Sequence, residues 1–287
     1  MEEVDELKAQ EKILDILRAA AAIYNKDKVP ARYASIRPHH ERMPAMNYLA
    51  LALIPLAATA AIAAERDHGP GIAGQRQGEA MVYPVRNFDA IRLGGSERVV
   101  VHIGNGYSVR AEGPAAAFVN FRIARDGSAL VVGRRYDERE SSAMERQIVV
   151  HVTMPALRAA SVGGSGSLNA DRAGGDRFSA GVGGSGSLRI DALDARTAEF
   201  NVGGSGMISA AGTVGTLEAN VGGSGGIAAA GLRASNAQVS VGGSGTVRAT
   251  VSGPAQVSMA GSGMVDLGPQ ARCTVSKVGG GRVRCGN

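Results

Sequence analysis

A Gly-Ser-Gly triplet returns at a nearly fixed interval through the second half of the sequence. Its successive serines are separated by 20, 20, 19, 20 and 18 residues. A fixed period of about 20 residues is typical of a solenoid, in which each repeat buries its apolar face only against its neighbours. The central serines are Ser165, Ser185, Ser205, Ser224, Ser244 and Ser262, and a degenerate seventh copy is Gly279-Gly280-Gly281.

The residues that flank each triplet alternate between apolar and polar. Every residue three positions after the serine is branched and apolar, and every residue three positions before it is Val or Met. Polar residues separate the apolar ones, as Glu199 and Asn201 do on either side of Phe200. Period-two alternation on both sides of a glycine corner predicts two short, half-buried strands per repeat.

Strands that recur in one direction at a fixed step stack as a parallel β-helix, with like residues about 4.8 Å apart. We therefore predict an all-β fold, with a parallel β-helix of about 20-residue coils within residues 81–287. The glycines are expected at a corner where positive φ or close contact between coils excludes a Cβ. The six central serines are expected to form a structural corner ladder, whose hydroxyls satisfy backbone groups.

The glycine pattern does not match the sites that glycines commonly build. A phosphate loop needs a following Lys and a helix, and a calcium-binding nonapeptide needs an Asp after the glycines. Gly222-Gly223-Ser224-Gly225-Gly226 fits the letters of a nucleophile elbow, but its sister copies keep the serine and break the pattern. The sequence therefore predicts no catalytic, cofactor-binding or metal site.

An uncharged segment, residues 43–64, precedes the predicted β-helix. An apolar run is followed there by small residues, and Ala58-Thr59-Ala60 and Ala61-Ile62-Ala63 fit signal-peptidase sites. The segment is predicted to be a signal peptide. A membrane anchor is the alternative, because 22 uncharged residues are long enough to span a bilayer.

Residues 1–42 form a leader with helical apolar spacing ahead of this segment. Either translation starts at Met43 or Met46, or the leader is a cytoplasmic helix before a signal anchor. Residues 65–80 are predicted to be a flexible linker. The mature protein is expected in the periplasm, on the outer surface or secreted, or else anchored in the inner membrane facing the periplasm.

Residues 81–157 are also rich in predicted strands but show no obvious repeat. Turns are expected at Gly94-Gly95 and Gly104-Asn105-Gly106, and later strands at 129–132 and 148–154. The stretches "VRNFDAIRLGGSERVVVHIG" and "VHVTMPALRAASVGGSGSL", followed by the serial triplets, resemble the bacterial head GIN domain family, labelled a putative autotransporter adhesin. The resemblance covers residues 82–285. It implies an exported, β-helix-like domain with an adhesion or surface role and no established catalytic residues.

Cys273 and Cys285 are the two cysteines of the chain. Counted from Gly280, they fall in slots that hold inward residues such as Ala255 and Leu267 in earlier repeats. Both thiols are predicted to face the interior of the last coil. In an oxidising compartment they would form a disulfide that stabilises the fold by about 3 kcal/mol. Two buried free thiols are the alternative.

Charged residues gather at the predicted outer corners of two early repeats: Asp171, Asp176, Asp191 and Asp194 with Arg172, Arg177, Arg189 and Arg196. Solvated turns account for these groups. A carbohydrate-active β-helix enzyme, either a polysaccharide lyase or a hydrolase, is the alternative that would use them. His68, His102 and His151 are expected to point outward from the fold.

The prediction for function is an exported, non-enzymatic β-helix protein with a binding or structural role at the envelope or surface. Its ligand is not specified by the sequence, and a glycan is one candidate class. The net charge of +5 comes without aromatic–basic clusters, so no nucleic-acid partner is expected, and no cofactor is expected. Exposed coil ends without an aromatic plug favour a homo-oligomer formed through those ends.

Overall fold

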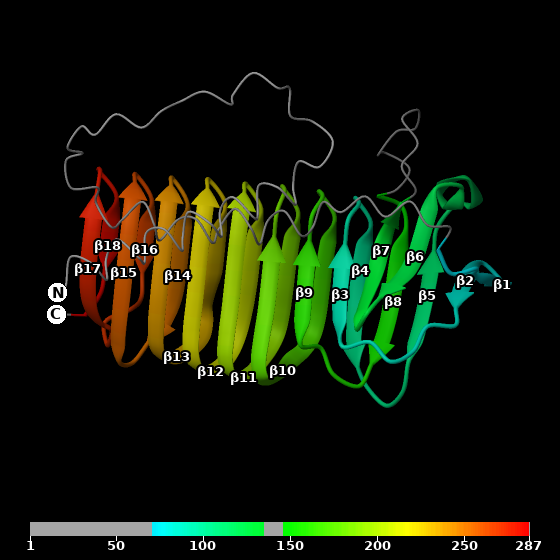
Figure 1. The fold of residues 1–287 in the computed structure, drawn as a ribbon, viewed down its shortest axis with the longest axis horizontal. Helices are drawn as coiled ribbons and strands as arrows, with labels where there is room; N and C mark the ends of the chain where they lie inside the picture. Colours follow the sequence, from blue (N-terminus) through cyan, green and yellow to red (C-terminus); the bar gives the residue numbers. More distant parts are fainter. Residues whose placement is uncertain (1–70, 135–145, 287) are drawn as a thin grey trace, which may run out of the picture. The chain divides into compact units, whose positions relative to one another are not determined.

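The structure is a computed structural model that describes residues 71–134 and 146–286, all within the unit Tyr48–Asn287. These residues form an all-β solenoid whose coils lie side by side (Figure 1). None of the described residues belongs to a helix long and apolar enough to cross a bilayer. The elements are β1 Gln75–Gln77, β2 Ala80–Tyr83, β3 Ala90–Leu93, β4 Arg98–Ile103, β5 Ser108–Glu112, η3 Ala115–Phe118, β6 Phe121–Asp126, β7 Ala129–Arg134, β8 Val149–Met154, β9 Ala159–Val162, β10 Ser167–Val182, β11 Ser187–Gly204, β12 Met207–Gly223, β13 Gly226–Gly243, β14 Thr246–Val251, β15 Pro254–Gly261, β16 Met264–Asp266, β17 Arg272–Val278 and β18 Arg282–Arg284.

Each coil has two arms that meet at the Gly-Ser-Gly corner. In the central coils one long strand runs from the arm after a corner, around the far bend, to the arm before the next corner, as β10 to β13 do. Neighbouring coils pair in parallel and in register, so Leu168 lies beside Leu188 and Val182 beside Val202. The predicted parallel stacking is confirmed. The two strands predicted per repeat are separate only in the later coils, as β14 and β15 are, because in β10 to β13 the pairing continues around the far bend.

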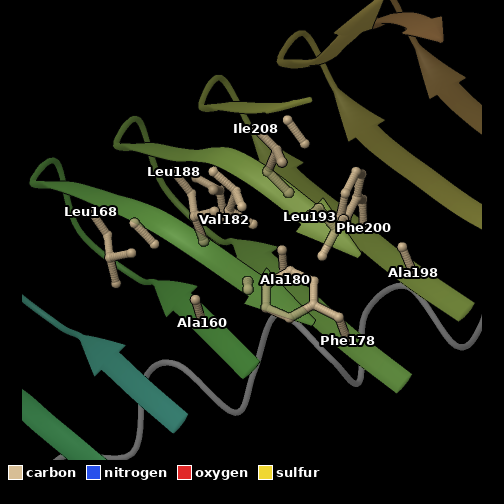
Figure 2. Close-up of a cluster of buried hydrophobic side chains, with 14 of the residues drawn as sticks. Ala160, Leu168, Phe178, Ala180, Val182, Leu188, Leu193, Ala198, Phe200 and Ile208 are labelled. Carbon is tan, nitrogen blue, oxygen red and sulfur yellow. The ribbon is translucent and has the colours of Figure 1, made fainter. Parts of the chain in front are cut away.

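The interior of the solenoid consists of stacked apolar residues, in which aliphatic side chains lie on one another and each phenylalanine lies beside an alanine of the next coil (Figure 2). Leu168, Leu188 and Ile208 form one row, and Phe178 and Phe200 project between the arms from the other side. All five side chains are almost completely buried. Aliphatic packing of this kind is the main favourable term in the fold, because it removes apolar surface from water in every coil.

The corner glycines are required by the closeness of successive coils. A Cβ at Gly186 would lie 2.6 Å from the carbonyl oxygen of Gly166 and 2.6 Å from Val162 Cγ1. A Cβ at Gly223 would lie 2.6 Å from the carbonyl oxygen of Gly204. The φ of Gly223, +123°, is also one that L-residues rarely adopt. The prediction that the corner excludes a Cβ is confirmed at both positions.

The corner serines are exposed in every one of the six repeats. Backbone groups bridge the corners: the Ser224 N–H donates to the Gly204 carbonyl at 3.0 Å, and the Gly225 N–H donates to the same oxygen at 2.8 Å. Main-chain bonds between coils therefore supply much of the corner's hydrogen bonding. A supporting role for the hydroxyls themselves stays a prediction.

Two further coils lie in the segment that showed no obvious repeat. Strands β3 and β4 pair in parallel with β9 and β10 on one side, and with β7 and β8 on the other. The coil of residues 90–103 is therefore sandwiched between β7 and β8 on one side and β9 and β10 on the other, all of which come later in the chain. The absence of a repeat upstream was a wrong expectation, because an excursion through residues 104–128 separates coils that are adjacent in space.

Antiparallel strands and aromatic side chains finish the N-terminal end of the stack. Strand β5 pairs antiparallel with β8, β2 with β5, and β6 with β7. Phe121 packs edge-on against Tyr83 and Phe118, with ring centroids 6.0 and 5.6 Å apart, and Phe88 contacts Tyr107 at 5.0 Å. The expected lack of an aromatic plug is therefore corrected at this end.

A disulfide joins Cys273 in β17 to Cys285 just after β18, with their Cα atoms 6.2 Å apart. Both residues pack against the core, and Cys273 lies in register with the inward-facing Ala255. This agrees with the predicted pairing inside the last coil. The bond links the two arms of the coil across its open end.

The predicted leader (residues 1–42) and signal peptide (residues 43–64) lie outside the described residues. The predicted linker, residues 65–80, is described from residue 71 onward. There it contains β1 and the first residue of β2, which pair with each other as an antiparallel hairpin. This part of the predicted linker is joined to the folded unit.

Replacing a corner glycine with alanine should separate tight corners from loose ones. We expect Gly223→Ala to lower the free energy of unfolding by about 1–3 kcal/mol, because it combines positive φ with a carbonyl clash. Gly280→Ala is the matched control, since nothing lies within 4 Å of a Cβ there. Urea unfolding followed by circular dichroism measures both, and equal losses would contradict the steric account.

Removing the disulfide should loosen the last coil first. Because the bridge closes a loop with a sequence separation of 12, we expect Cys273→Ser with Cys285→Ser to cost about 2–3 kcal/mol. The loss should appear as faster amide hydrogen exchange in β17, with exchange in β11 unchanged, because each coil contacts only its neighbours. Uniform acceleration throughout the solenoid would show that the bond acts globally.

Candidate binding face

Outward side chains of the arms that precede each corner form two straight polar rows. They project from β10, β11, β12, β13, β15 and β17, alternating with buried residues such as Phe200. We call this surface the amide–hydroxyl face. One row is Ser179, Glu199, Glu218, Gln238, Gln256 and Thr274, and the other is Asn201, Asn220, Ser240, Ser258 and Ser276, with Gly181 at the corresponding backbone position of β10.

Hydrogen bonds within and between coils orient the middle of this face. The Arg177 guanidinium donates to Glu199 Oε2 at 3.3 Å, and Asn201 Nδ2 donates to Glu199 Oε1 at 3.0 Å. One coil further on, Asn220 Nδ2 donates to Asn201 Oδ1 at 3.0 Å. The amides are therefore held in fixed orientations by their neighbours. A ligand that binds here does not have to pay the full entropy of ordering them.

Two carboxylates face each other at the centre of the amide–hydroxyl face. Glu199 and Glu218 are paired in register on adjacent strands, which lie about 4.8 Å apart. Both are half-buried rather than fully solvated. Like charges directly opposite each other on a sheet are destabilising. Both oxygens of Glu199 already accept hydrogen bonds, from Arg177 and Asn201. A ligand that donates hydrogen bonds to the Glu218 carboxylate would relieve part of the remaining repulsion.

The face offers hydrogen bonding without aromatic stacking. Within the described coils from residue 159 onward, the aromatic side chains are Phe178 and Phe200, and both are buried. The exposed groups are carboxylates, amides and hydroxyls, which accept and donate hydrogen bonds. The chemistry available to a ligand is therefore polar, and it repeats from coil to coil.

The charged outer corners form ion pairs between neighbouring coils. Arg196 binds Asp176 through two hydrogen bonds, 2.6 and 3.0 Å long, and this partner lowers the pKa of the Asp176 carboxyl. Asp171 accepts the Ile103 N–H at 3.0 Å and contacts His102 Nδ1 at 2.5 Å. These carboxylates bind groups of the fold itself.

Three more of the charged corner residues are also engaged within the fold, whereas Asp194 is exposed. Arg189 pairs with Asp191 at 2.7 Å, and Arg172 donates to the Ile103 carbonyl at 2.5 Å. His102 and His151 are exposed on their strands, as expected, whereas His68 lies outside the described residues. Among the described residues, no group of three or more His, Cys, Asp or Glu side chains could hold a metal ion.

One further corner, at Ser96, has the sequence spacing of the repeats without the complete triplet. Ser96 follows Gly94-Gly95, with Leu93 three positions before it and Val99 three positions after it, as in the repeats. In the structure Ser96 Oγ lies 3.2 Å from Ser165 Oγ, at hydrogen-bonding distance. Glu97 stands where the repeats have their second glycine, so the triplet was hidden.

Several solved structures resemble this fold at low sequence identity. A putative adhesin from Bacteroides fragilis NCTC 9343 has a TM-score of 0.64 and 19% identity, covering 75% of this chain and 100% of its own. A protein from Parabacteroides distasonis ATCC 8503, named a putative lipid binding protein, has a TM-score of 0.57 and 17% identity, with coverages of 75% and 98%. A putative adhesin from Parabacteroides merdae ATCC 43184 has a TM-score of 0.55 and 15% identity, with coverages of 75% and 99%.

At such identities these structures establish a shared fold. No curated protein matches the chain. The sequence model of the family described as "Putative auto-transporter adhesin, head GIN domain" matches residues 87–284, which is more than half of the chain. Together with the triplet corners and the solenoid they build, this match shows that the chain belongs to the head GIN domain family.

Proposed function

We propose that this chain is an exported, non-enzymatic binding protein of the bacterial envelope or surface, and that its amide–hydroxyl face binds an extended, hydroxyl-rich polymer such as a glycan. The observation that carries the proposal is the pair of in-register polar rows, with Glu199 opposite Glu218 at their centre. The family description as an adhesin supports a binding role at the surface.

A glycan fits the chemistry of this face. Sugar hydroxyls donate to carboxylates and amide oxygens, and their oxygens accept from amide N–H groups. Each hydrogen bond contributes only about 0.5–1.5 kcal/mol net, and the face has no exposed aromatic ring to add stacking. Affinity would therefore come from repetition along the coils, as in multivalent binding. A polymer should bind much more tightly than a monosaccharide.

A polysaccharide lyase or hydrolase is the competing function. Its candidate acid and base groups were the corner residues, of which Asp176 forms a bidentate pair with Arg196 and Asp171 accepts the Ile103 N–H. These contacts give the carboxylates a structural role. They favour binding without turnover for this chain.

The proposed location is the periplasm, the outer surface or the medium, with an inner-membrane anchor as the alternative. One structural neighbour is named a putative lipid binding protein. For this chain we propose a polar ligand instead, because the interior between the arms is filled by its own buried side chains, such as Leu188, Phe200 and Ile208. We propose no nucleic-acid partner and no cofactor.

Binding to a glycan microarray, followed by titration of the best polymer, tests this function. We expect the double variant Glu218→Gln with Asn220→Ala to weaken binding about tenfold, because it removes hydrogen bonds worth about 1.4 kcal/mol in total. Asn169→Ala is the matched control, since Asn169 is an outward asparagine on the arm that follows a corner. Its affinity should equal that of the unmodified chain.

Each outcome separates the functions. Saturable binding that the double variant weakens and Asn169→Ala preserves supports the proposed face. Shortening of the bound polymer, detected by size-exclusion chromatography, would support the enzyme. Failure to bind any polymer on the array would overturn the proposal in favour of a purely structural protein.

A further inference from the structure

The two ends of the solenoid differ in how their strands are covered. At the N-terminal end, strand β8 is followed by antiparallel β5 and then β2. At the other end, β17 pairs with β15 and β18 pairs with β16, and no strand of the described residues pairs with their outer sides (Figure 1). The last coil therefore presents an open strand edge, which is a template for another strand.

The backbone of β17 directs hydrogen-bonding groups to this open side. The Arg272 N–H donates to the Gly253 carbonyl at 3.0 Å, on the side of the preceding coil. Alternate residues of a parallel strand direct their amides to opposite sides. The N–H and C=O groups of Cys273, Val275 and Lys277 are therefore directed outward, where an added strand would meet them.

Apolar surface lies along the same edge. Val275 is in register with Val257, which is completely buried, but Val275 itself is 45% exposed because no described coil covers it. Val278 at the end of the strand is 57% exposed. In the described residues these are two of five large hydrophobic side chains with such exposure. An added strand with apolar side chains on its inner side would bury Val275.

The positive charge of the last coil favours an acidic partner. Arg272, Lys277, Arg282 and Arg284 are all exposed in the last coil, and the nearby carboxylate is Asp266, which lies 3.9 Å from Arg284. Lys277 occupies an inward slot and donates to the Gly281 carbonyl at 2.9 Å, so its ammonium lies at the open cross-section. Acidic side chains on an added strand would pair with these cations.

We propose that the β17 edge binds an acidic, extended peptide segment of a partner protein, which adds to the solenoid as one more strand. Main-chain bonds to β17 would supply affinity, and acidic side chains opposite Arg272 and Lys277 would supply selectivity. The disulfide that links Cys273 to Cys285 holds the template in place. A second copy of this chain fits less well, because two cationic ends would face each other. This inference concerns the end of the stack and is independent of the amide–hydroxyl face.

The test uses the full chain and two labelled heptapeptides, followed by fluorescence anisotropy. The probe Glu-Val-Thr-Val-Thr-Glu-Val places carboxylates opposite Arg272 and Lys277 in a parallel register and valine over Val275. The control peptide carries lysine in place of both glutamates. We expect saturable binding of the acidic probe, at least tenfold weaker binding of the lysine peptide, and weakening of the acidic complex by added salt.

Two variants locate the site. Val275→Pro removes an N–H directed to the open side without removing a bond to β15, and proline is tolerated on edge strands. We expect Val275→Pro to lower the affinity for the acidic probe at least tenfold. Its circular dichroism spectrum and melting temperature should stay close to those of the unmodified chain. Arg272→Glu should lower the affinity for the acidic probe. Its control is Arg233→Glu, at an exposed arginine on β13, and this variant should leave the affinity unchanged. If Val275→Pro fails to fold, the arginine pair still decides.

Several results would overturn the proposal. Equal affinity for the two peptides, or undiminished binding to Val275→Pro or Arg272→Glu, would exclude strand addition by an acidic segment at this edge. Absence of binding to the acidic probe would do the same. A dimer in analytical ultracentrifugation that Val275→Pro dissociates would instead assign the edge to a second copy of the chain.

Discussion

Close contact between glycine corners and the carbonyl oxygens of the preceding coil sets the geometry of the whole stack. At Gly223 a Cβ would meet the Gly204 oxygen at 2.6 Å, and the same oxygen accepts hydrogen bonds from the Ser224 and Gly225 N–H groups. Because the corners fix the register, Leu168 lies on Leu188 and Glu199 on Glu218. The buried rows and the exposed polar rows are both consequences of this one constraint.

The repeat made the coils predictable, and the departures from it could not be predicted in the same way. Inward positions such as Leu168 and Val182 follow directly from their distance to the corner serine. Ser96 follows the same rule, but Glu97 breaks the triplet there. The coil that contains Ser96 also pairs with β7, which residues 104–128 separate from it in the chain. The aromatic cluster around Phe121 depends on antiparallel pairings between distant segments, for which the local pattern carries no information.

The candidate site was partly visible in the sequence for the same reason. Alternation around Phe200 placed Glu199 and Asn201 outward, and the structure confirms it. The hydrogen bond from Asn220 to Asn201 depends on side-chain orientation, which alternation does not specify. The charged corners were grouped by closeness in the chain, whereas Asp176 pairs with Arg196, 20 residues away, because one solenoid period brings those positions together.

The coil of residues 90–103 breaks the sequential order that most solenoids follow. A stack whose coils follow chain order can unravel from either end, one turn at a time. Here β3 and β4 are clamped between β7–β8 and β9–β10, so tension that reaches β3, after the edge hairpin β1–β2 has come away, shears several strands at once. The carboxyl end, where β17 and β18 are each held on one side, peels strand by strand. The described solenoid is therefore mechanically polar: once β1–β2 has come away, its first coil in chain order resists force that its last coil does not.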